Sequence, residues 1–281
     1  MALISMKKTL LDARQNGYAV PLFDAPSLNA AVGVVRAAEA VHAPVIIGMY
    51  DGWFQSPGAE AVCTGMRVLA ERASVPVSLM LDHGSSYENC IKAIRYGFTD
   101  VMFDGSMLPF EENARISQMI AKAGKAVGVG VEAELGHVGV GADYDIDKAK
   151  KYFTQPKMVE KFVKATGVDF LAIAFGTAHG EYKCTPQLDL DLLMRVNAVS
   201  PVPLVMHGGS GLSNEQFLGS ISRGICKVNI ATVIFKDFEN RIREKAAEKQ
   251  TDIFTVEEQL IESYITICTQ YLMLFGTAGK A

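Results

Sequence analysis

Short apolar runs alternate with segments of helical periodicity along the whole chain. An apolar run bounded by glycine, proline or polar residues is typical of a buried strand, and apolar residues three or four positions apart are typical of a helix. The expected strands are residues 18–23, 44–48, 77–81, 100–103, 126–134, 170–174, 203–206 and 226–230. The expected helices are residues 27–41, 59–73, 87–96, 111–123, 156–166, 189–199, a helix from 213, a charged helix ending near 249, and 256–274.

This alternation predicts an α/β fold, namely a (β/α)8 TIM barrel with an additional C-terminal helix. The alternative is a doubly wound open sheet, which favours a Gly-x-Gly-x-x-Gly motif after the first strand. The chain has Phe23-Asp24-Ala25-Pro26 at that point, so the barrel is preferred. No linker or low-complexity segment interrupts the pattern, and residues 1–281 are expected to form one domain.

Composition and charge exclude several classes of protein. Of the 281 residues, 49% are hydrophobic, which is enough for a large core. The net charge is −4 and the basic residues form no run, so neither nucleic acid nor a membrane is an expected partner. Five scattered cysteines, the lack of an apolar leader and the lack of a long apolar segment favour a cytoplasmic location.

Two strand ends carry candidate phosphate-binding loops. His207 ends the strand at 203–206 and is followed by a glycine-rich loop, where small residues and free backbone N–H groups favour an anion. The strand at 226–230 runs into the start of a helix, and the loops after the last two strands commonly bind phosphate in this fold. The alternative for both is an ordinary strand-to-helix turn. The candidate ligands are Gly208, Gly209, Ser210, Asn229, Ile230, Ala231 and Thr232.

Three of the five histidines follow strands. His83, His179 and His207 come after the third, sixth and seventh expected strands, and each is followed by glycine. The carboxyl ends of barrel strands converge on one face, so these imidazoles are candidate ligands of one divalent transition metal. His42 precedes the second strand and belongs to the opposite face, whereas His137 lies on an insertion at 135–152 and is not assigned to the site.

Carboxylates are expected on the same face. Asp82 adjoins His83, Asp104 follows the fourth strand, and Glu132 and Glu134 alternate on the fifth strand, so that both point to one side. Such groups move protons, orient a histidine or bind a metal directly. The alternative is a purely structural role.

These residues occur in motifs that resemble the class II, metal-dependent ketose-bisphosphate aldolases, and most of all their tagatose-bisphosphate branch. The resemblance covers nearly the whole chain. The motifs are Leu81-Asp82-His83, Val131-Glu132-Ala133-Glu134-Leu135-Gly136, Gly176-Thr177-Ala178-His179-Gly180, His207-Gly208-Gly209-Ser210-Gly211 and Asn229-Ile230-Ala231-Thr232. The resemblance implies reversible aldol cleavage of a ketose 1-phosphate or 1,6-bisphosphate to dihydroxyacetone phosphate and an aldehyde. It also implies one catalytic Zn²⁺ per subunit, room for a monovalent cation, and a homo-oligomer, either dimer or tetramer.

The resemblance also suggests a role for each residue. His83, His179 and His207 would hold the metal, Asp82 would donate the proton to the substrate oxygen, and Gly180 would join the phosphate loops. Asp104 and Glu134 match positions that can hold the metal in a second, buried site.

Three departures surround the sugar-chain end of the expected site. Asp24 stands where the family has asparagine, Tyr50 where serine is common, and Ala142 where a proton-moving glutamate is usual. We expect Asp143 to take over as the base, with Asp145 as the alternative, on an insertion that forms a mobile lid. A different distal group on the substrate, such as a sulfonate, is compatible with these departures. The motifs are also compatible with an isomerase or epimerase that uses the same metal chemistry, and with a non-catalytic sugar-phosphate binder.

Overall fold

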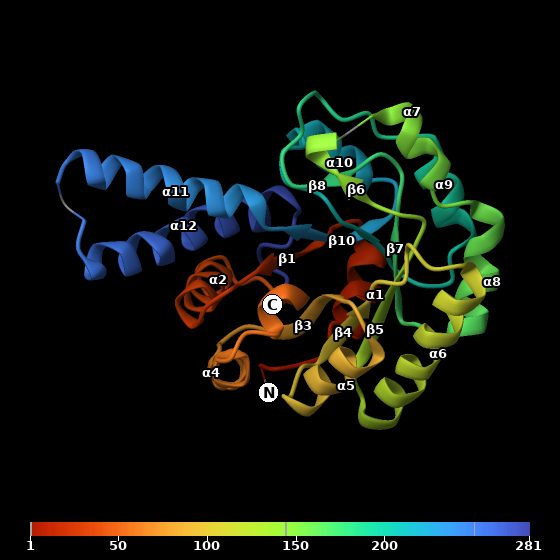
Figure 1. Cartoon of the computed structure of the whole chain (residues 1–281), viewed down its shortest axis with the longest axis horizontal. Coiled ribbons are helices and arrows are strands. Elements are labelled where there is room, and N and C mark those ends of the chain that lie inside the picture. Colours follow the sequence, from red (N-terminus) through yellow and green to blue (C-terminus); the bar gives the residue numbers. More distant parts are fainter. Residues whose placement is uncertain (1, 144, 250) are drawn as a thin grey trace.

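The computed structural model contains a closed barrel of parallel strands (Figure 1). It describes residues 2–143, 145–249 and 251–281. Around the barrel the strands are β1 (Val20–Asp24), β10 (Ile225–Ile230), β9 (Leu204–Met206), β7 (Phe170–Ile173), β5 (Gly130–Leu135), β4 (Asp100–Phe103), β3 (Val77–Gly84) and β2 (Val45–Tyr50). Because β1 pairs with both β2 and β10, the sheet closes. The predicted TIM barrel is therefore confirmed and the open-sheet alternative is wrong.

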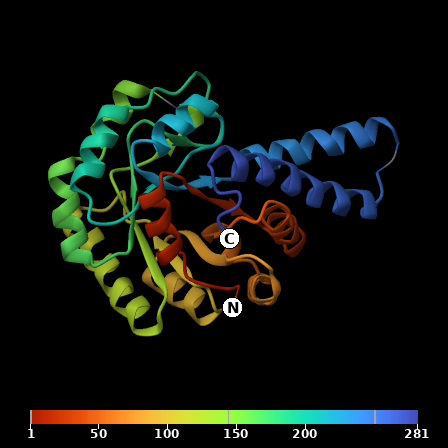
Figure 2. The same cartoon turned by 180° about the vertical axis from the view of Figure 1, so that it is seen from behind.

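Helices cover the outside of the barrel (Figures 1 and 2). They are α1 (Lys7–Asn16), α2 (Leu28–Ala40), α3 (Asp51–Phe54), α4 (Ala59–Arg72), α5 (Tyr87–Arg95), α6 (Phe110–Val127), α7 (Ile146–Ala149), α8 (Pro156–Thr166), α9 (Leu190–Val199), α10 (Asn214–Ile221), α11 (Thr232–Ala247) and α12 (Ile253–Leu274). Several begin at a side chain that accepts a hydrogen bond from a first-turn amide, among them Ser27, Ser86, Asp189 and Ser213. Such caps satisfy N–H groups that have no partner within the helix.

One expected strand is partly wrong. Residues 126–134 form an almost continuous apolar run, yet Ala126 and Val127 belong to the last turn of α6. Gly128 ends that helix with a positive φ of 79°, which glycine adopts without strain. β5 therefore begins only at Gly130.

The sequence analysis did not predict α1, which closes the N-terminal end of the barrel. Met6, Leu10 and Ala13 are fully buried and share one apolar cluster with side chains from the barrel interior. Ser5 Oγ and the Met6 amide donate hydrogen bonds to buried Asp100 at 2.7 and 3.1 Å, which fixes the start of α1 against β4. With this end filled, the opposite end of the barrel is left for a binding site.

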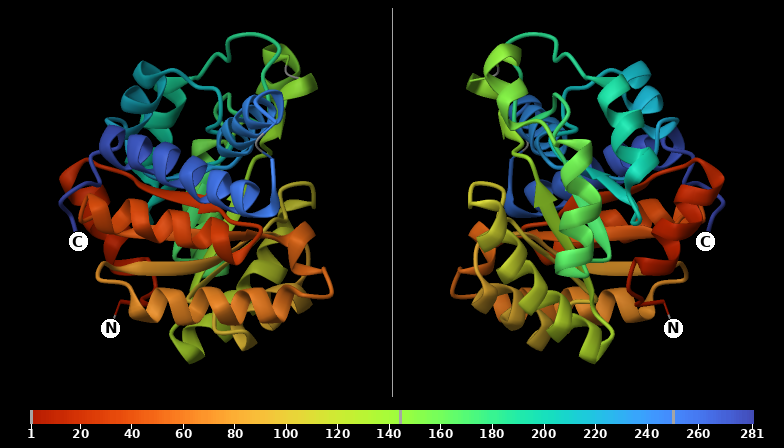
Figure 3. Two further views of the ribbon diagram at one scale, coloured as in Figure 1. Left: turned by 90° about the vertical axis from the view of Figure 1, so that its left-hand side faces the viewer. Right: turned by 90° about the vertical axis from the view of Figure 1, so that its right-hand side faces the viewer.

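Both chain termini lie at the closed end. The Val77 amide donates to the Ala2 carbonyl at the start of β3, and the Ala281 amide donates to the His42 carbonyl just before β2. Figure 3 shows the N- and C-terminal ends on the same side of the barrel. His42 thus lies at the end of the barrel remote from the carboxyl ends of the strands, as expected.

Helices α11 and α12 pack side by side and project beyond the barrel (Figures 1 and 2). At their outer end, Ile253 and Phe254 are 65% and 80% exposed. At their base, α12 packs on α2, and the Tyr264 hydroxyl donates to the backbone carbonyl of Asp24 at 2.6 Å. Helix α12 therefore supports the end of β1. No helix within the described residues is long and apolar enough to cross a membrane.

We predict that Gly33→Ala destabilises the protein. A Cβ on Gly33 would overlap the Cβ of Tyr264 and would lie 2.9 Å from the Ile261 carbonyl oxygen, so α2 and α12 would have to separate. Overpacking of this kind costs about 1–3 kcal/mol in the free energy of unfolding, measurable by urea denaturation. Gly219→Ala in α10 is the control, because its nearest side-chain neighbour is Leu190 at 3.4 Å, an ordinary contact. An unchanged unfolding free energy for Gly33→Ala would contradict this account of the α2–α12 packing.

Candidate active site

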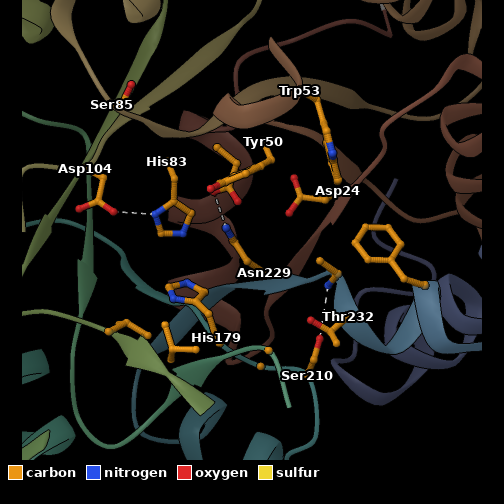
Figure 4. Close-up of a pocket in the computed structure, with 18 of the residues that line it drawn as sticks. Asp24, Tyr50, Trp53, His83, Ser85, Asp104, His179, Ser210, Asn229 and Thr232 are labelled. Carbon is orange, nitrogen blue, oxygen red and sulfur yellow. Dashed lines mark hydrogen bonds and ion pairs between the residues drawn. The ribbon is translucent and has the colours of Figure 1, made fainter. Parts of the chain in front are cut away.

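A pocket of about 710 Å³ opens at the carboxyl ends of the barrel strands. Its lining side chains come from segments that are far apart in the sequence, including the ends of β1, β2, β3 and β10 and the first turn of α11. Figure 4 shows His83 and His179 next to each other in the pocket, with Asp24, Tyr50 and Trp53 to one side and Ser210 and Thr232 to another. Barrel closure alone brings these segments together.

The three histidines form a compact cluster. One ring nitrogen from each of His83, His179 and His207 lies within 4.8 Å of the others. His207 Nδ1 and His83 Nε2 are only 2.9 Å apart. His179 Nε2 is buried and has no hydrogen-bond partner among the described residues. Three imidazole nitrogens that converge in this way, one of them unpartnered, suit a tetrahedral metal with an open fourth position.

A distortion in β3 places Asp82 and His83 in the same pocket. Adjacent residues of a regular strand point to opposite faces, but the pairing of β3 with β4 shifts between Leu81 and Gly84. Within this bulge His83 has a positive φ of 51°, a conformation that costs free energy for any residue other than glycine. As a result both side chains line the pocket.

Two carboxylates orient the histidines, the half-buried Asp104 and the fully buried Glu132. Asp104 Oδ2 lies 2.8 Å from His83 Nδ1, and Glu132 Oε1 lies 2.7 Å from His207 Nε2. Each contact fixes which ring nitrogen faces the cluster, the usual arrangement around metal-binding histidines. Lys227 Nζ in turn contacts Glu132 at 3.0 Å and Asn229 Oδ1 at 2.7 Å, and both ends of the Lys227–Glu132 ion pair are fully buried.

Two of the three histidines are neutral as metal binding requires, and the third, His83, must release a proton when a metal binds. Burial and the charge on His83 lower the pKa of His179 to about 4, and burial lowers the pKa of His207 well below its usual value. Burial would also lower the pKa of His83, but Asp82, Asp104 and Glu134 outweigh it and raise that pKa to about 10. The cluster thus contains two neutral imidazoles. The carboxylates around His83 favour a positive charge at that position.

Asp104 and Glu134 share a second group of possible ligands with His83. Their candidate ligand atoms also lie within 4.8 Å of one another. Glu134 is buried, and its Oε1 accepts from the Val138 amide while Oε2 has no partner in the described part of the chain. Burial raises the pKa of Glu134 to about 8. This geometry is compatible with the alternative, buried metal position.

The first phosphate loop lies at the pocket wall. Gly180, Gly208, Gly209 and Ser210 all line the pocket. Gly208 has a φ of 69°, and a Cβ there would overlap the backbone of Ala178, so only glycine fits. This close approach keeps the loop in the pocket wall, beside the histidine cluster.

The second phosphate loop also reaches the pocket. Asn229 lines it, and so do Ala231 and Thr232 at the start of α11, where the helix N-terminus favours an anion. The Asn229 side-chain amide donates to Asp82 Oδ1 at 2.8 Å, and its contact with a phosphate stays a prediction. The Ile230 side chain is buried in the core, so Ile230 could contribute only its backbone.

The insertion at 135–152 contacts the loop that carries His179. Strand β6 (Gly139–Val140) pairs with β8 (Ala178–His179), and two short 3-10 helices, η1 (Gly141–Asp143) and η2 (Lys150–Tyr152), flank α7. The side chain of Asp143 lies outside the described residues. Asp145 Oδ1 accepts from the Asp147 and Lys148 amides and caps α7, so its carboxylate is already engaged.

His137, which the sequence analysis left unassigned, lines the pocket. Its Nδ1 lies 2.9 Å from Ser106 Oγ, and Ser106 Oγ donates to Asp104 at 2.6 Å. Since the serine proton goes to Asp104, His137 Nδ1 must donate to Ser106, which leaves Nε2 unprotonated. Burial lowers the pKa of His137, and the ring is therefore a neutral candidate base.

Comparison with known proteins identifies the family to which this chain belongs. A family model described as fructose-bisphosphate aldolase class-II matches residues 4–280. The chain belongs to this family. A fructose-bisphosphate aldolase of Geobacillus stearothermophilus is 40% identical over 251 residues, covering 88% of this chain and 87% of that protein.

Solved structures of the family agree with the fold. The crystal structure of the YdjI aldolase from Escherichia coli K12 matches with a TM-score of 0.90 at 32% identity, covering 99% of both chains. The class II aldolase family predicted from the motifs is therefore confirmed, and the chain is an aldolase of the lyase class. The nearer resemblance to the tagatose-bisphosphate branch stays a prediction.

Lys227 is the main site residue that sequence reasoning missed. It lies on β10 between buried residues, where a lysine is almost never found without a partner. A lysine within an apolar strand was the signal in the sequence that a buried partner exists. The partner, Glu132, lies 95 residues away in the sequence. Only the barrel brings the two together.

We predict that Lys227→Met lowers the free energy of unfolding by about 3–5 kcal/mol, because Glu132 would remain buried without its cation. Urea denaturation measures the effect. Lys164→Met is the control, since its ion pair with Glu160 is exposed and is worth about 0–1 kcal/mol. Combining Lys227→Met with Glu132→Gln should recover much of the loss. If the single variant is as stable as the Lys164→Met control, the ion pair has no structural role.

Proposed function

We propose that this protein catalyses the zinc-dependent, reversible aldol cleavage of a ketose 1-phosphate or 1,6-bisphosphate to dihydroxyacetone phosphate and an aldehyde. The observation that carries the proposal is the joining, in one pocket, of the three-histidine cluster with two loops suited to phosphate. Phosphate in these loops would place the ketone carbons of the three-carbon unit beside the histidines.

The histidine cluster would hold the metal through His83, His179 and His207. A bound divalent ion would supply a Lewis acid that polarises the ketone carbonyl. The residues of the chain bind the substrate and orient the metal ligands. Gly208 to Ser210 and the start of α11 hold the phosphate and so fix the reacting carbons. Asp104 and Glu132 keep the histidine rings in one orientation through the bonds described above.

Asp82 would accept the proton of the substrate hydroxyl group when the carbon–carbon bond is cleaved. It lies in the pocket next to His83, is 3% exposed, and is held by the hydrogen bond from Asn229 Nδ2. A carboxylate held at the reacting oxygen can take up and return its proton during cleavage and condensation.

The base that moves the proton at the ketone carbon would come from the insertion at 135–152. Asp143 remains the candidate from the sequence, and Asp145 is disfavoured because it caps α7. His137 is a second candidate, since its ring lines the pocket as a neutral base. Movement of the insertion as a lid remains part of the proposal.

The oligomer expected from the family also remains a proposal. The projecting α11–α12 pair offers a surface for a second copy, with Phe254 80% exposed at its outer end. A homodimer or homotetramer formed through this surface would cover that apolar side chain.

The proposed function predicts zinc-dependent release of dihydroxyacetone phosphate. The purified protein should release it from ketose 1-phosphates or 1,6-bisphosphates with bound Zn²⁺, and chelation should abolish the release. His207→Ala should lower metal content and activity together, because it leaves only two of the three histidines. Mass spectrometry of the metal and an enzyme-coupled assay give the two readouts.

His42→Ala is the matched control, since His42 is an exposed histidine at the far end of the barrel. Conversion of the sugar phosphate without release of a three-carbon product would favour an isomerase or epimerase. Binding without any turnover would favour a non-catalytic binder. Full metal content and full activity in His207→Ala would refute the metal site.

We predict that Asp82→Asn keeps the fold and the metal but lowers kcat by about 10²–10⁴-fold, the usual contribution of a general acid or base. The amide is nearly isosteric and still accepts from Asn229, but it cannot exchange a proton. Steady-state kinetics at saturating substrate, with metal content measured on the same sample, give the result. A wild-type kcat would leave Asp82 with only a structural role.

A further inference from the structure

One wall of the pocket is built from aromatic rings. Tyr50 and Trp53 lie 5.8 Å apart between ring centroids, and Trp53 and Phe235 are separated by the same distance, with the rings nearly perpendicular in both pairs. All three residues line the pocket. Figure 4 shows Tyr50 and Trp53 on the side away from Ser210 and His179. The part of a substrate beyond the phosphate and the metal cluster would meet this wall.

Asp24 adds a polar group beside the wall. Its side chain lines the pocket and is 6% exposed, and Oδ1 has no hydrogen-bond partner among the described residues. The backbone of Asp24 is fixed by the hydrogen bond from the Tyr264 hydroxyl to its carbonyl oxygen. The carboxylate oxygen Oδ1 fits beside Gly48 because that residue has no Cβ. A buried oxygen without a protein donor is costly unless a ligand supplies one. A hydroxyl group is the simplest such donor.

The described residues that line this pocket include neither lysine nor arginine. Two lysines on the adjoining elements β10 and α11 are both engaged. Lys227 is buried against Glu132, and Lys236 pairs with Glu181 in a smaller neighbouring pocket. That smaller pocket shares Gly180, Ser210 and Thr232 with the main one, so Lys236 lies on the phosphate-loop side.

These features favour some chemical groups over others at the end of the substrate remote from the 1-phosphate. A second phosphate or a sulfonate at the wall would lose its hydration without gaining a lysine or arginine partner, and it would face aromatic rings whose faces are negative. An uncharged chain bearing hydroxyls would instead pack its C–H groups on the rings and donate a hydrogen bond to Asp24. The two ends of the pocket therefore suit different chemistry, with an anion at the loops and a neutral polyol at the wall.

We propose that the aldehyde half of the substrate is an uncharged, hydroxylated chain, so that the enzyme acts on ketose 1-phosphates in preference to 1,6-bisphosphates. This rests on the proposed function and narrows it. Asp24 and Trp53 are assigned as the specificity-determining residues, Asp24 as the hydroxyl acceptor and Trp53 as the central ring of the wall.

The test is run in the condensation direction with the zinc-loaded protein. Solvent-deuterium exchange into dihydroxyacetone phosphate is measured first, because it needs the loops and the histidine cluster but no aldehyde. Condensation is then followed with D-glyceraldehyde and with D-glyceraldehyde 3-phosphate, which differ only in the distal phosphate. We expect kcat/KM to be at least tenfold higher for D-glyceraldehyde.

A variant of Trp53 and a matched control test the role of the aromatic wall. Trp53→Arg places a cation there and should shift the ratio of the two kcat/KM values at least tenfold toward the phosphorylated aldehyde. Val127→Arg, in the exposed last turn of α6 at the closed end of the barrel, is the control and should leave the ratio unchanged. The comparison of the two aldehydes in the unmodified protein decides the proposal even if Trp53→Arg does not fold.

The outcomes are separable. Exchange together with equal or faster condensation of the phosphorylated aldehyde overturns this proposal and leaves the aldolase function standing. Exchange without reaction of either aldehyde also overturns it, because a short hydroxylated aldehyde should fit. Absence of both exchange and condensation refutes the proposed function itself.

Discussion

Closure of the barrel between β1 and β10 is the constraint on which the rest of the structure depends. It sets Leu22 beside Asn229 and Phe23 beside Ile230, residues from opposite ends of the chain. With the sheet closed and α1 filling its N-terminal end, every strand delivers its last residues to the same opening. Function in a fold of this kind is therefore confined to one face.

A chain of buried polar contacts couples the strands behind that face. Lys227 on β10 binds Glu132 on β5, Glu132 binds His207 after β9, and Asn229 binds Asp82 on β3. Buried charges are stable only when they are paired, so these contacts fix the registers of several strands as well as the rings of the histidines. Structural stability and the orientation of the candidate metal ligands thus rest on the same side chains.

The pocket in front of this network has two chemically distinct ends. Backbone amides at glycine-rich turns and at the start of α11 form one end, where an anion is favoured. Aromatic rings and the Asp24 carboxyl form the other, and the described lining residues include neither lysine nor arginine. Asp24 and Tyr50 are positions at which the sequence departs from the pattern it otherwise resembles. A family with a shared reaction can vary its substrates through such positions while the metal ligands stay the same.

The sequence by itself determined the alternation of strands and helices, the histidines at strand ends and the glycine-rich loops. These are local patterns, visible as periodicity or as single motifs, and they were sufficient to predict the barrel and the family. Tertiary structure alone decided which distant groups meet: Lys227 with Glu132, His137 with Ser106, and the Asn229 amide with Asp82. It also decided that α1 fills the barrel and that Ala126 and Val127 end a helix, because an apolar residue suits a buried helix and a buried strand equally well.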